Sequence, residues 1–297
     1  MEKMKPHLLV LGGTGFLGRQ IAEEGLLRGF RVSVFSRSQP TSLRHERAEI
    51  SFAKLGEKTE VQSAPEDVDV IINSLAIYGR GGESEIEITN VNYVIPTAIA
   101  RHYLSSERLH PLKLFLNVDT ALRSEVSIYA KSKAAFRAEL ARIQSAPIVG
   151  LRLDQFYGPG DAASKFITML VQKFVSKVAT IPLSSGVQKR RFLFARDAVL
   201  AIFDVVEAAV AKRLAFGAGA EAILPPLGDE RTVKDVVMLT QKISGGEPTK
   251  LDFGALKDRG IETDALLVPK GFEFLSERVC IGLEEGIKVV FEAEKKT

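Results

Sequence analysis

The chain has 297 residues, of which 45% are hydrophobic and 26% charged, the composition of an ordinary globular protein with a sizeable core. Its net charge of +3 comes from lysines and arginines scattered among acidic residues. We therefore expect no nucleic-acid partner, which would need a concentrated basic face, whereas a small anionic ligand suits this charge. We expect no membrane partner either, because there is no run of about 18 apolar residues and the N-terminal MEKMKPH is unlike a signal peptide.

Cysteine usage indicates a reducing compartment. Cys280 is the only cysteine, so the chain forms no internal disulfide, and we expect a cytoplasmic protein. No motif places a histidine beside Cys280, which favours a buried small apolar residue over a catalytic thiol. No metal ion is expected.

The first half of the chain alternates strands and helices. The strand-like stretches are apolar and without polar alternation, as expected of parallel strands covered on both faces. The predicted strands lie at 8–11, 31–36, 68–76, 112–119 and 147–153, and the predicted helices at 15–28, 91–104 and 129–144. This order predicts an α/β fold with a doubly wound parallel sheet, the Rossmann architecture.

The pattern loosens after FYGPGD (156–161). Helices are expected at 162–177 and 197–212, with strand-like RRFLFA between them and EAILPPLG (221–228) after them. No linker separates the halves, so we predict a smaller, interleaved C-terminal substrate domain. The predicted division assigns 1–154 and about 186–224 to the Rossmann domain, and about 155–185 and 225–297 to the substrate-binding region.

Three glycines stand between the first strand and the first helix, at Gly12, Gly15 and Gly18. This spacing serves a tight turn, a close approach of the backbone to a pyrophosphate, and close packing of helix on strand. The helix N-terminus adds unpaired N–H groups and a partial positive charge. The loop therefore predicts dinucleotide binding, the alternative being a glycine-rich turn without a ligand.

The end of the second strand bears on the choice of cofactor. An acidic residue usually meets the ribose 2′-hydroxyl there, but this chain has Ser36, Arg37 and Ser38. Arg37 could pair with a 2′-phosphate, which favours NADP (NADPH) over NAD. The alternative is a solvated surface arginine.

Tyr129 and Lys133 stand four residues apart in SIYAKSKAAF and so share one helix face. A free phenol has a pKa of about 10, and a nearby ammonium lowers it. Such a pair can protonate a carbonyl oxygen while hydride adds to the carbon. Thr120 ends the preceding strand, where its hydroxyl could bond the reacting oxygen or simply cap a turn.

These motifs resemble the extended short-chain dehydrogenase/reductases, in the branch of nucleotide-sugar epimerases and dehydratases, over nearly the whole chain. GGTGFLG looks like the cofactor fingerprint of that family, and YAKSK like its catalytic Tyr-x-x-x-Lys. Three further segments are similar to the branch: LRLDQFYGPGD, GVQKRRFLFARDAVLAI and GLEEGI.

The resemblance implies roles for individual residues. Tyr129 would be the general acid, with Lys133 holding the nicotinamide ribose and Thr120 in the place of the catalytic Ser or Thr. The substrate would be held by Gln155 and by Arg190, the latter as a clamp on a diphosphate. The expected cofactor-binding residues are Gly12, Thr14, Gly15, Phe16, Leu17, Gly18, Arg37, Leu75, Ala76, Asn92 and Lys133.

Departures from the family pattern narrow the activity. The dehydratases carry Asp and Glu after their Thr, whereas Ala121 and Leu122 follow Thr120, so 4,6-dehydration is not expected. Arg191 replaces the usual Asp after the clamping arginine. The short NVDTAL–YAKSK interval looks most like the nucleotide-sugar 4-ketoreductases of the branch.

We therefore expect NADPH-dependent reduction of the 4-keto group of a nucleotide-diphosphate deoxysugar, of the kind used for a surface polysaccharide. Two alternatives remain: an epimerase with tightly bound NAD, and a non-catalytic NADP-sensing regulator. The resemblance also implies a possible homodimer.

Overall fold

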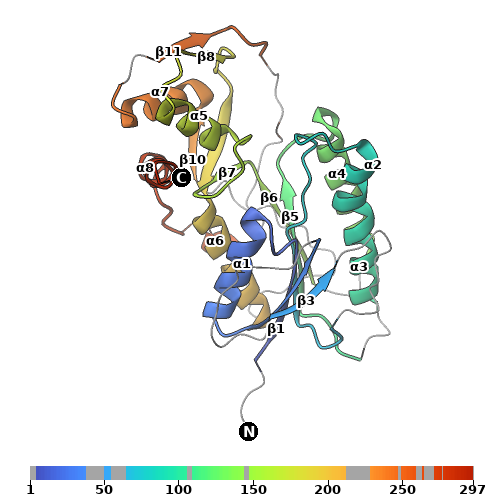
Figure 1. The fold of residues 1–297 in the computed structure, drawn as a ribbon. Helices are drawn as coiled ribbons and strands as arrows, with labels where there is room; N and C mark the ends of the chain where they lie inside the picture. Colours follow the sequence, from blue (N-terminus) through green and yellow to red (C-terminus); the bar gives the residue numbers. More distant parts are fainter. Residues whose placement is uncertain are drawn as a thin grey trace.

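The computed structural model describes residues 5–37, 50–54, 65–105, 109–143, 147–211, 228–246, 249–258, 263, 271–275 and 277–296. These residues form a large lower part built on one sheet and a smaller upper part (Figure 1). The first strand enters the sheet from below, and the last helix lies in the upper part.

The lower part contains a six-stranded sheet in the order β3-β2-β1-β4-β5-β6. Every neighbouring pair is parallel, which confirms the predicted doubly wound Rossmann sheet. The strands are β1 (His7–Leu11), β2 (Arg31–Ser36), β3 (Ile50–Lys54), β4 (Val70–Asn73), β5 (Leu114–Thr120) and β6 (Ile148–Leu153).

Helices cover both faces of this sheet (Figure 1). One face carries α1 (Phe16–Leu27) and α6 (Ala195–Val210). The other carries α2 (Glu85–Thr89), a π-helical turn (Asn90–Val94), α3 (Ile95–Tyr103) and α4 (Ile128–Leu140). Each face has its own apolar core, because side chains of parallel strands point alternately to the two helix layers.

The upper part has a separate core. Its sheets are β10-β9-β7 and β11-β8, and α5, α7 and α8 pack around them. The bounds are β7 (Gln155–Tyr157), α5 (Phe166–Val175), β8 (Thr180–Leu183), β9 (Lys189–Phe194), β10 (Asp229–Thr232), α7 (Val233–Ile243), β11 (Lys250–Phe253) and α8 (Leu283–Glu294). Two 3₁₀ turns, Ser124–Val126 and Glu273–Leu275, complete the described elements.

The chain moves back and forth between the two parts. It leaves the lower sheet after β6, builds β7 to β9 above, and returns as α6, whose Phe203 and Ile202 pack in the same core as Leu8. The predicted domain division stays a prediction, and its boundary near 224 lies outside the described residues.

Some elements differ from the sequence-based expectation. The strand β3 was not predicted, because it is only five residues long, ISFAK, and ends in a lysine. The strand expected at 68–76 is only Val70–Asn73, whose pairing with β1 ends at Leu11, the last residue of β1, with a bond from Ser74 N–H to Leu11 O at 2.9 Å. The helix expected from 162 starts at Phe166, after a turn closed by Lys165 N–H on Ala162 O. Most of EAILPPLG lies outside the described residues.

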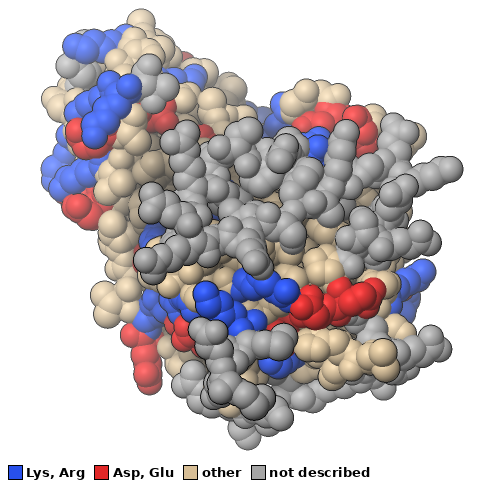
Figure 2. Space-filling view, turned by 60° about the horizontal axis from the view of Figure 1, so that its bottom comes forward, with Lys and Arg blue, Asp and Glu red and all other residues tan. Residues whose placement is uncertain are grey.

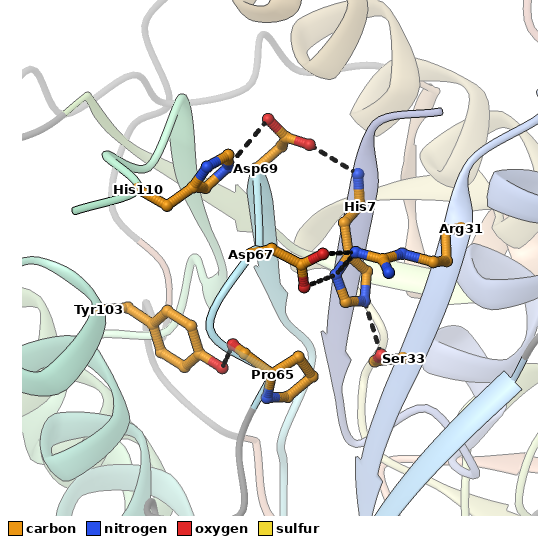
Figure 3. A network of polar contacts seen from close by, with 8 residues as sticks. All are labelled: His7, Arg31, Ser33, Pro65, Asp67, Asp69, Tyr103 and His110. Carbon is orange, nitrogen blue, oxygen red and sulfur yellow. Dashed lines mark hydrogen bonds and ion pairs between the residues drawn. The ribbon is translucent and has the colours of Figure 1, made fainter. Parts of the chain in front are cut away.

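A buried polar network lies at the amino edge of the sheet (Figure 3). His7 Nε2 lies 2.7 Å from Ser33 Oγ, and His7 Nδ1 lies 3.0 Å from Asp67 Oδ1. Arg31 pairs with Asp67, and the backbone N–H of His7 donates to Asp69 Oδ2 at 2.8 Å. These contacts join the starts of β1, β2 and β4.

Charges of both signs share the face seen in Figure 2, where blue and red side chains lie next to one another. Among the described residues, no helix is both long and apolar enough to cross a membrane. Within the same ranges, no group of His, Cys, Asp and Glu side chains has the arrangement of a metal site.

Candidate active site

A cavity of about 410 Å³ lies at the carboxyl edge of the large sheet, where ligands bind in open α/β folds. Its walls come from the glycine loop, the loop after β4, the helix α4 and the segment after β7. It brings together nine of the predicted site residues: Gly15, Phe16, Leu17, Gly18, Arg37, Leu75, Ala76, Tyr129 and Lys133.

The glycine loop has the geometry that the spacing predicts. Gly12 has φ +80, and its N–H donates to Phe35 O at 2.7 Å, so it makes the tight turn. A Cβ on Gly18 would lie 2.2 Å from Gly12 O, so only glycine lets α1 pack this closely on the loop. Gly15 is exposed and precedes α1 without a side-chain cap, and α1 has no acidic residue in its first turn. The residues at this end of α1 therefore fit an anion such as a dinucleotide pyrophosphate.

The residues expected near the 2′-phosphate of the cofactor lie at the end of β2. Thr14 Oγ1 hydrogen-bonds to Ser36 Oγ, which ties the glycine loop to that strand. Arg37 is exposed and lines the cavity, so its guanidinium is available to an anionic ligand. Ser38 lies outside the described residues.

Tyr129 is held in the first turn of α4, which Ser127 caps by accepting from Ala130 N–H at 3.2 Å. Its ring is buried, with 7% of the residue exposed. Burial raises the pKa of Tyr129 well above its usual value, and charge on Tyr78 and on Asp119 raises it further. A hydrogen bond with Thr120 acts in the opposite direction and lowers this pKa.

Lys133 lies one turn along α4 and is 2% exposed. Its ammonium donates to Val118 O at 2.7 Å and to Leu75 O at 3.3 Å. Burial lowers the pKa of Lys133, while Asp119 raises it.

One electrostatic expectation differs from the structure. We expected the Lys133 ammonium to lower the pKa of Tyr129, but burial, Tyr78 and Asp119 raise it and Thr120 is the group that lowers it. The reason is geometric, because the Lys133 ammonium is directed at the Val118 and Leu75 carbonyls.

Thr120 occupies the last position of β5 and is buried beside Tyr129. Its Oγ1 accepts from Leu122 N–H at 3.2 Å and also bonds the Tyr129 side chain. One hydroxyl therefore serves a turn contact and a contact with Tyr129, and its place on a proton path stays a prediction.

Asn92 lies behind the cavity rather than in its lining, and its predicted contact with the cofactor stays a prediction. It is 0% exposed, and its Nδ2 donates to Ile77 O and to Ile88 O, each at 2.8 Å. Its Oδ1 accepts from Ile77 N–H at 3.1 Å. All these contacts hold the loop after β4, so Asn92 shapes the cavity wall from behind.

The two predicted substrate-binding residues lie outside the lining of the cavity. Arg190 on β9 is 8% exposed, and its Nη1 donates to Thr263 Oγ1 at 3.2 Å. Thr263 forms a backbone bridge with Leu122, which connects Arg190 to the segment after Thr120. The Gln155 amide donates to Asp154 Oδ1 at 3.2 Å.

Several cavity residues were not predicted. Tyr78 stands out, because its ring centroid lies 4.7 Å from that of Tyr129. The others that bear on the chemistry are Arg80, Phe156, Asp161 and Lys165. The signal that could have found them is topological, since they follow the carboxyl ends of predicted strands, where the cavity of such a sheet lies.

Known proteins resemble this chain in sequence and in fold. A family model described as the NAD dependent epimerase/dehydratase family matches residues 8–216. The chain belongs to this family. Its sequence is 23% identical to CDP-abequose synthase of Salmonella typhimurium over 284 residues, covering 88% of this chain and 89% of the relative. The CDP-abequose synthase of Salmonella muenchen is 22% identical over 275 residues, covering 88% of each chain.

Solved structures of this family share the fold. UDP-glucuronic acid 4-epimerase from Bacillus cereus, in complex with UDP-glucuronic acid and NAD, aligns with a TM-score of 0.78 at 18% identity, covering 98% of this chain and 99% of that one. dTDP-glucose 4,6-dehydratase from Bacillus anthracis, in complex with NAD, aligns with a TM-score of 0.72 at 18% identity, covering 98% and 97%. The resemblance stated from the motifs is thereby confirmed, since the family model covers residues 8–216 and the fold is shared across nearly the whole chain.

Proposed function

We propose that the protein reduces the 4-keto group of a nucleotide-diphosphate deoxysugar with NADPH. The observation that carries this proposal is the single cavity in which the glycine loop, Arg37, Tyr129 and Lys133 meet. The groups proposed to bind the cofactor and the group proposed to donate the proton thus line the same cavity. The similarity to the CDP-abequose synthases supports the reductive direction.

The cofactor would supply a hydride, and the chain would supply the matching proton. Tyr129 O–H would donate to the oxygen of the carbonyl as the hydride adds to its carbon, and Thr120 would hold the developing alkoxide. Lys133 would hold the nicotinamide ribose, moving its ammonium from the Val118 and Leu75 carbonyls.

The residues after Thr120 support reduction rather than dehydration. Elimination of water across the sugar needs an acid and a base near the reacting carbons. Ala121 is 1% exposed and apolar, and Leu122 is bridged to Thr263. Neither can exchange a proton.

The preference for NADPH rests on Arg37. It is the residue at the end of β2 that lines the cavity, and a guanidinium pairs with a 2′-phosphate through two hydrogen bonds. An acidic residue, which would select the 2′-hydroxyl of NAD, is absent from the described end of β2.

An epimerase with tightly bound NAD is the second candidate, favoured by the fold shared with the Bacillus cereus 4-epimerase, whose structure contains NAD. A non-catalytic NADP-sensing regulator is less well supported, because both Tyr129 and Lys133 line the cavity.

The test is to incubate the purified protein with NADPH and a panel of nucleotide-diphosphate 4-keto sugars, following absorbance at about 340 nm. A reductase oxidises one NADPH per sugar. Sugar isomerisation without net change in NADPH would instead identify the epimerase, and binding of NADPH without turnover of any sugar would favour the regulator.

A further inference from the structure

The face of α4 that carries Tyr129 and Lys133 continues one turn further, to Arg137. Positions four apart lie on one side of a helix, so these three side chains form a row along α4. Each of the three is bonded to one of the last three residues of β5. The helix that carries the proposed proton donor is therefore docked on this strand through the same face.

Asp119 is the residue of this contact to which the proposed function gives no role. Its side chain is 1% exposed and belongs to the lining of the cavity. Oδ2 accepts from Arg137 Nη1 at 2.6 Å, and Oδ1 accepts from the backbone N–H of Thr120 at 2.7 Å. The carboxylate thereby ties α4 to the backbone of the residue that bonds Tyr129. Because both of its oxygens are used in protein contacts, Asp119 acts through its neighbours.

The Asp119 carboxylate also places a negative charge near Lys133. The Lys133 ammonium is 2% exposed, and the groups it bonds are neutral backbone carbonyls. Burial lowers the pKa of Lys133 most, Asp119 raises it, and Arg137 lowers it by less than Asp119 raises it. The carboxylate therefore favours the charged form of a lysine that its surroundings otherwise drive toward a neutral amine.

The same carboxylate acts on Tyr129. Burial raises the pKa of Tyr129 most, Tyr78 from the loop after β4 and Asp119 from β5 raise it further, and Thr120 lowers it. A general acid must carry its proton, and an ammonium offers three N–H donors to ribose hydroxyls. Asp119 favours both of these protonation states.

We propose that Asp119, fixed by Arg137, is a positioning residue that holds α4 against the end of β5 and keeps the buried Lys133 an ammonium. The inference rests on the proposed function, in which Tyr129 is the acid and Lys133 binds the nicotinamide ribose. In that role Lys133 turns away from two backbone carbonyls. The bond between Arg137 and Asp119 holds no reactant, so it remains in place when the lysine turns.

The first test needs neither cofactor nor substrate. NMR of protein labelled with ¹⁵Nζ-lysine gives the pH at which Lys133 loses its proton, its signal being the one that Lys133→Arg removes. Asp119→Asn keeps the size of the side chain and removes its charge, so Lys133 is expected to titrate at a lower pH than in the wild type. Arg137→Gln removes the opposing charge, so Lys133 is expected to titrate at a higher pH.

The opposite signs make the proposal falsifiable even if one variant fails to fold. An unmoved titration in Asp119→Asn, or a shift to lower pH in Arg137→Gln, overturns it. A loss of packing alone would not move the two variants in opposite directions.

Glu139→Gln provides the matched control. Glu139 lies on the same helix and also pairs with an arginine, since its Oε1 accepts from Arg101 Nη2 at 2.6 Å. It is not part of the cavity lining, nor one of the charges that act on Lys133. Breaking this pair is expected to leave the Lys133 titration in place. A shift as large as that in Asp119→Asn would trace the effect to disturbed packing of α4 and overturn the proposal.

The second test measures NADPH affinity without sugar, by fluorescence titration at two pH values. Asp119→Asn is expected to weaken NADPH binding less than about twofold at about pH 7 and about tenfold at about pH 9, because Lys133 then loses its proton within this range. A loss of equal size at both pH values is the mark of a purely structural role and overturns the proposal. If NADPH binds but no sugar is converted, the proposed reduction fails, and the lysine titration still decides the role of Asp119.

Discussion

The two edges of the large sheet both gather ionisable side chains, but these side chains differ in their access to a ligand. At the amino edge, Ser33, His7 and Asp67 stand in the order of a hydrolase triad, with contacts of 2.7 and 3.0 Å. Figure 3 shows these contacts. Ser33 is 2% exposed and His7 3% exposed, so neither side chain is open to a substrate. At the carboxyl edge, Tyr129 is also buried, with 7% of the residue exposed, yet it lines a cavity of about 410 Å³.

This difference shows that hydrogen-bond geometry alone does not identify a catalytic group. The amino-edge network joins three strand starts, and each of its polar side chains is used in those contacts. The carboxyl edge combines the hydrogen-bonded Tyr129, space for a ligand, and cationic side chains that line the cavity. We expect changes at the first edge to affect stability and changes at the second to affect turnover.

The largest expected effect is at the carboxyl edge. Tyr129→Phe removes the proposed acid and is expected to lower kcat about 10³-fold. NADPH affinity should stay within about twofold, because the ring and the glycine loop remain. Stopped-flow NADPH oxidation and fluorescence titration of NADPH measure the two quantities. Turnover near the wild-type level would show that another group supplies the proton.

The next effect is at the amino edge. His7→Ala leaves the partners of a buried imidazole unsatisfied and is expected to cost about 3 kcal/mol of unfolding free energy. Urea unfolding followed by circular dichroism measures it. The activity of the folded protein should be unchanged, and a selective loss of kcat would contradict the division of roles between the two edges.

A change at the cavity mouth tests the cofactor. Arg37→Glu is expected to weaken NADPH binding about 10- to 100-fold, because a charge-assisted pair with the 2′-phosphate becomes a repulsion. Binding of NADH, which lacks that phosphate, should change far less. Equal weakening of both cofactors in calorimetric titrations would remove the argument for NADP.

The smallest expected effect concerns pH. Burial lowers the pKa of His7 below its usual value of 6.5, although its bond to Asp67 acts the other way. The unfolded chain therefore binds a proton at a higher pH than the native protein, and the contribution of His7 to stability is present above pH 6.5 and lost as pH falls below it. The midpoint of urea unfolding should fall between about pH 6.5 and 5 in the wild type. In His7→Asn this part of the decline should be absent.

Patterns local in sequence predicted most of the fold. The glycine spacing, the apolar strands and the Tyr129–Lys133 interval depend on short-range periodicity, and the structure brings these residues together. Tyr78 and Lys165 escaped prediction because their contact joins segments far apart in the chain, and no periodicity marks such a meeting. The partners of the Asn92 amide could not be predicted for a related reason, since the family pattern gives its place on the helix but not its contacts.

The return of the chain as α6 has a consequence for how the protein is made. The core beneath β1 includes Phe203 of α6 and also Phe272 and Leu275, which are far along the sequence. During synthesis the first 154 residues therefore emerge with part of one face of their sheet uncovered, because α1 is followed on that face, among the described segments, only by these later ones. That apolar surface is fully covered only after α6 and then Phe272 and Leu275 have been synthesised, and nascent chains of this protein should be clients of chaperones until then.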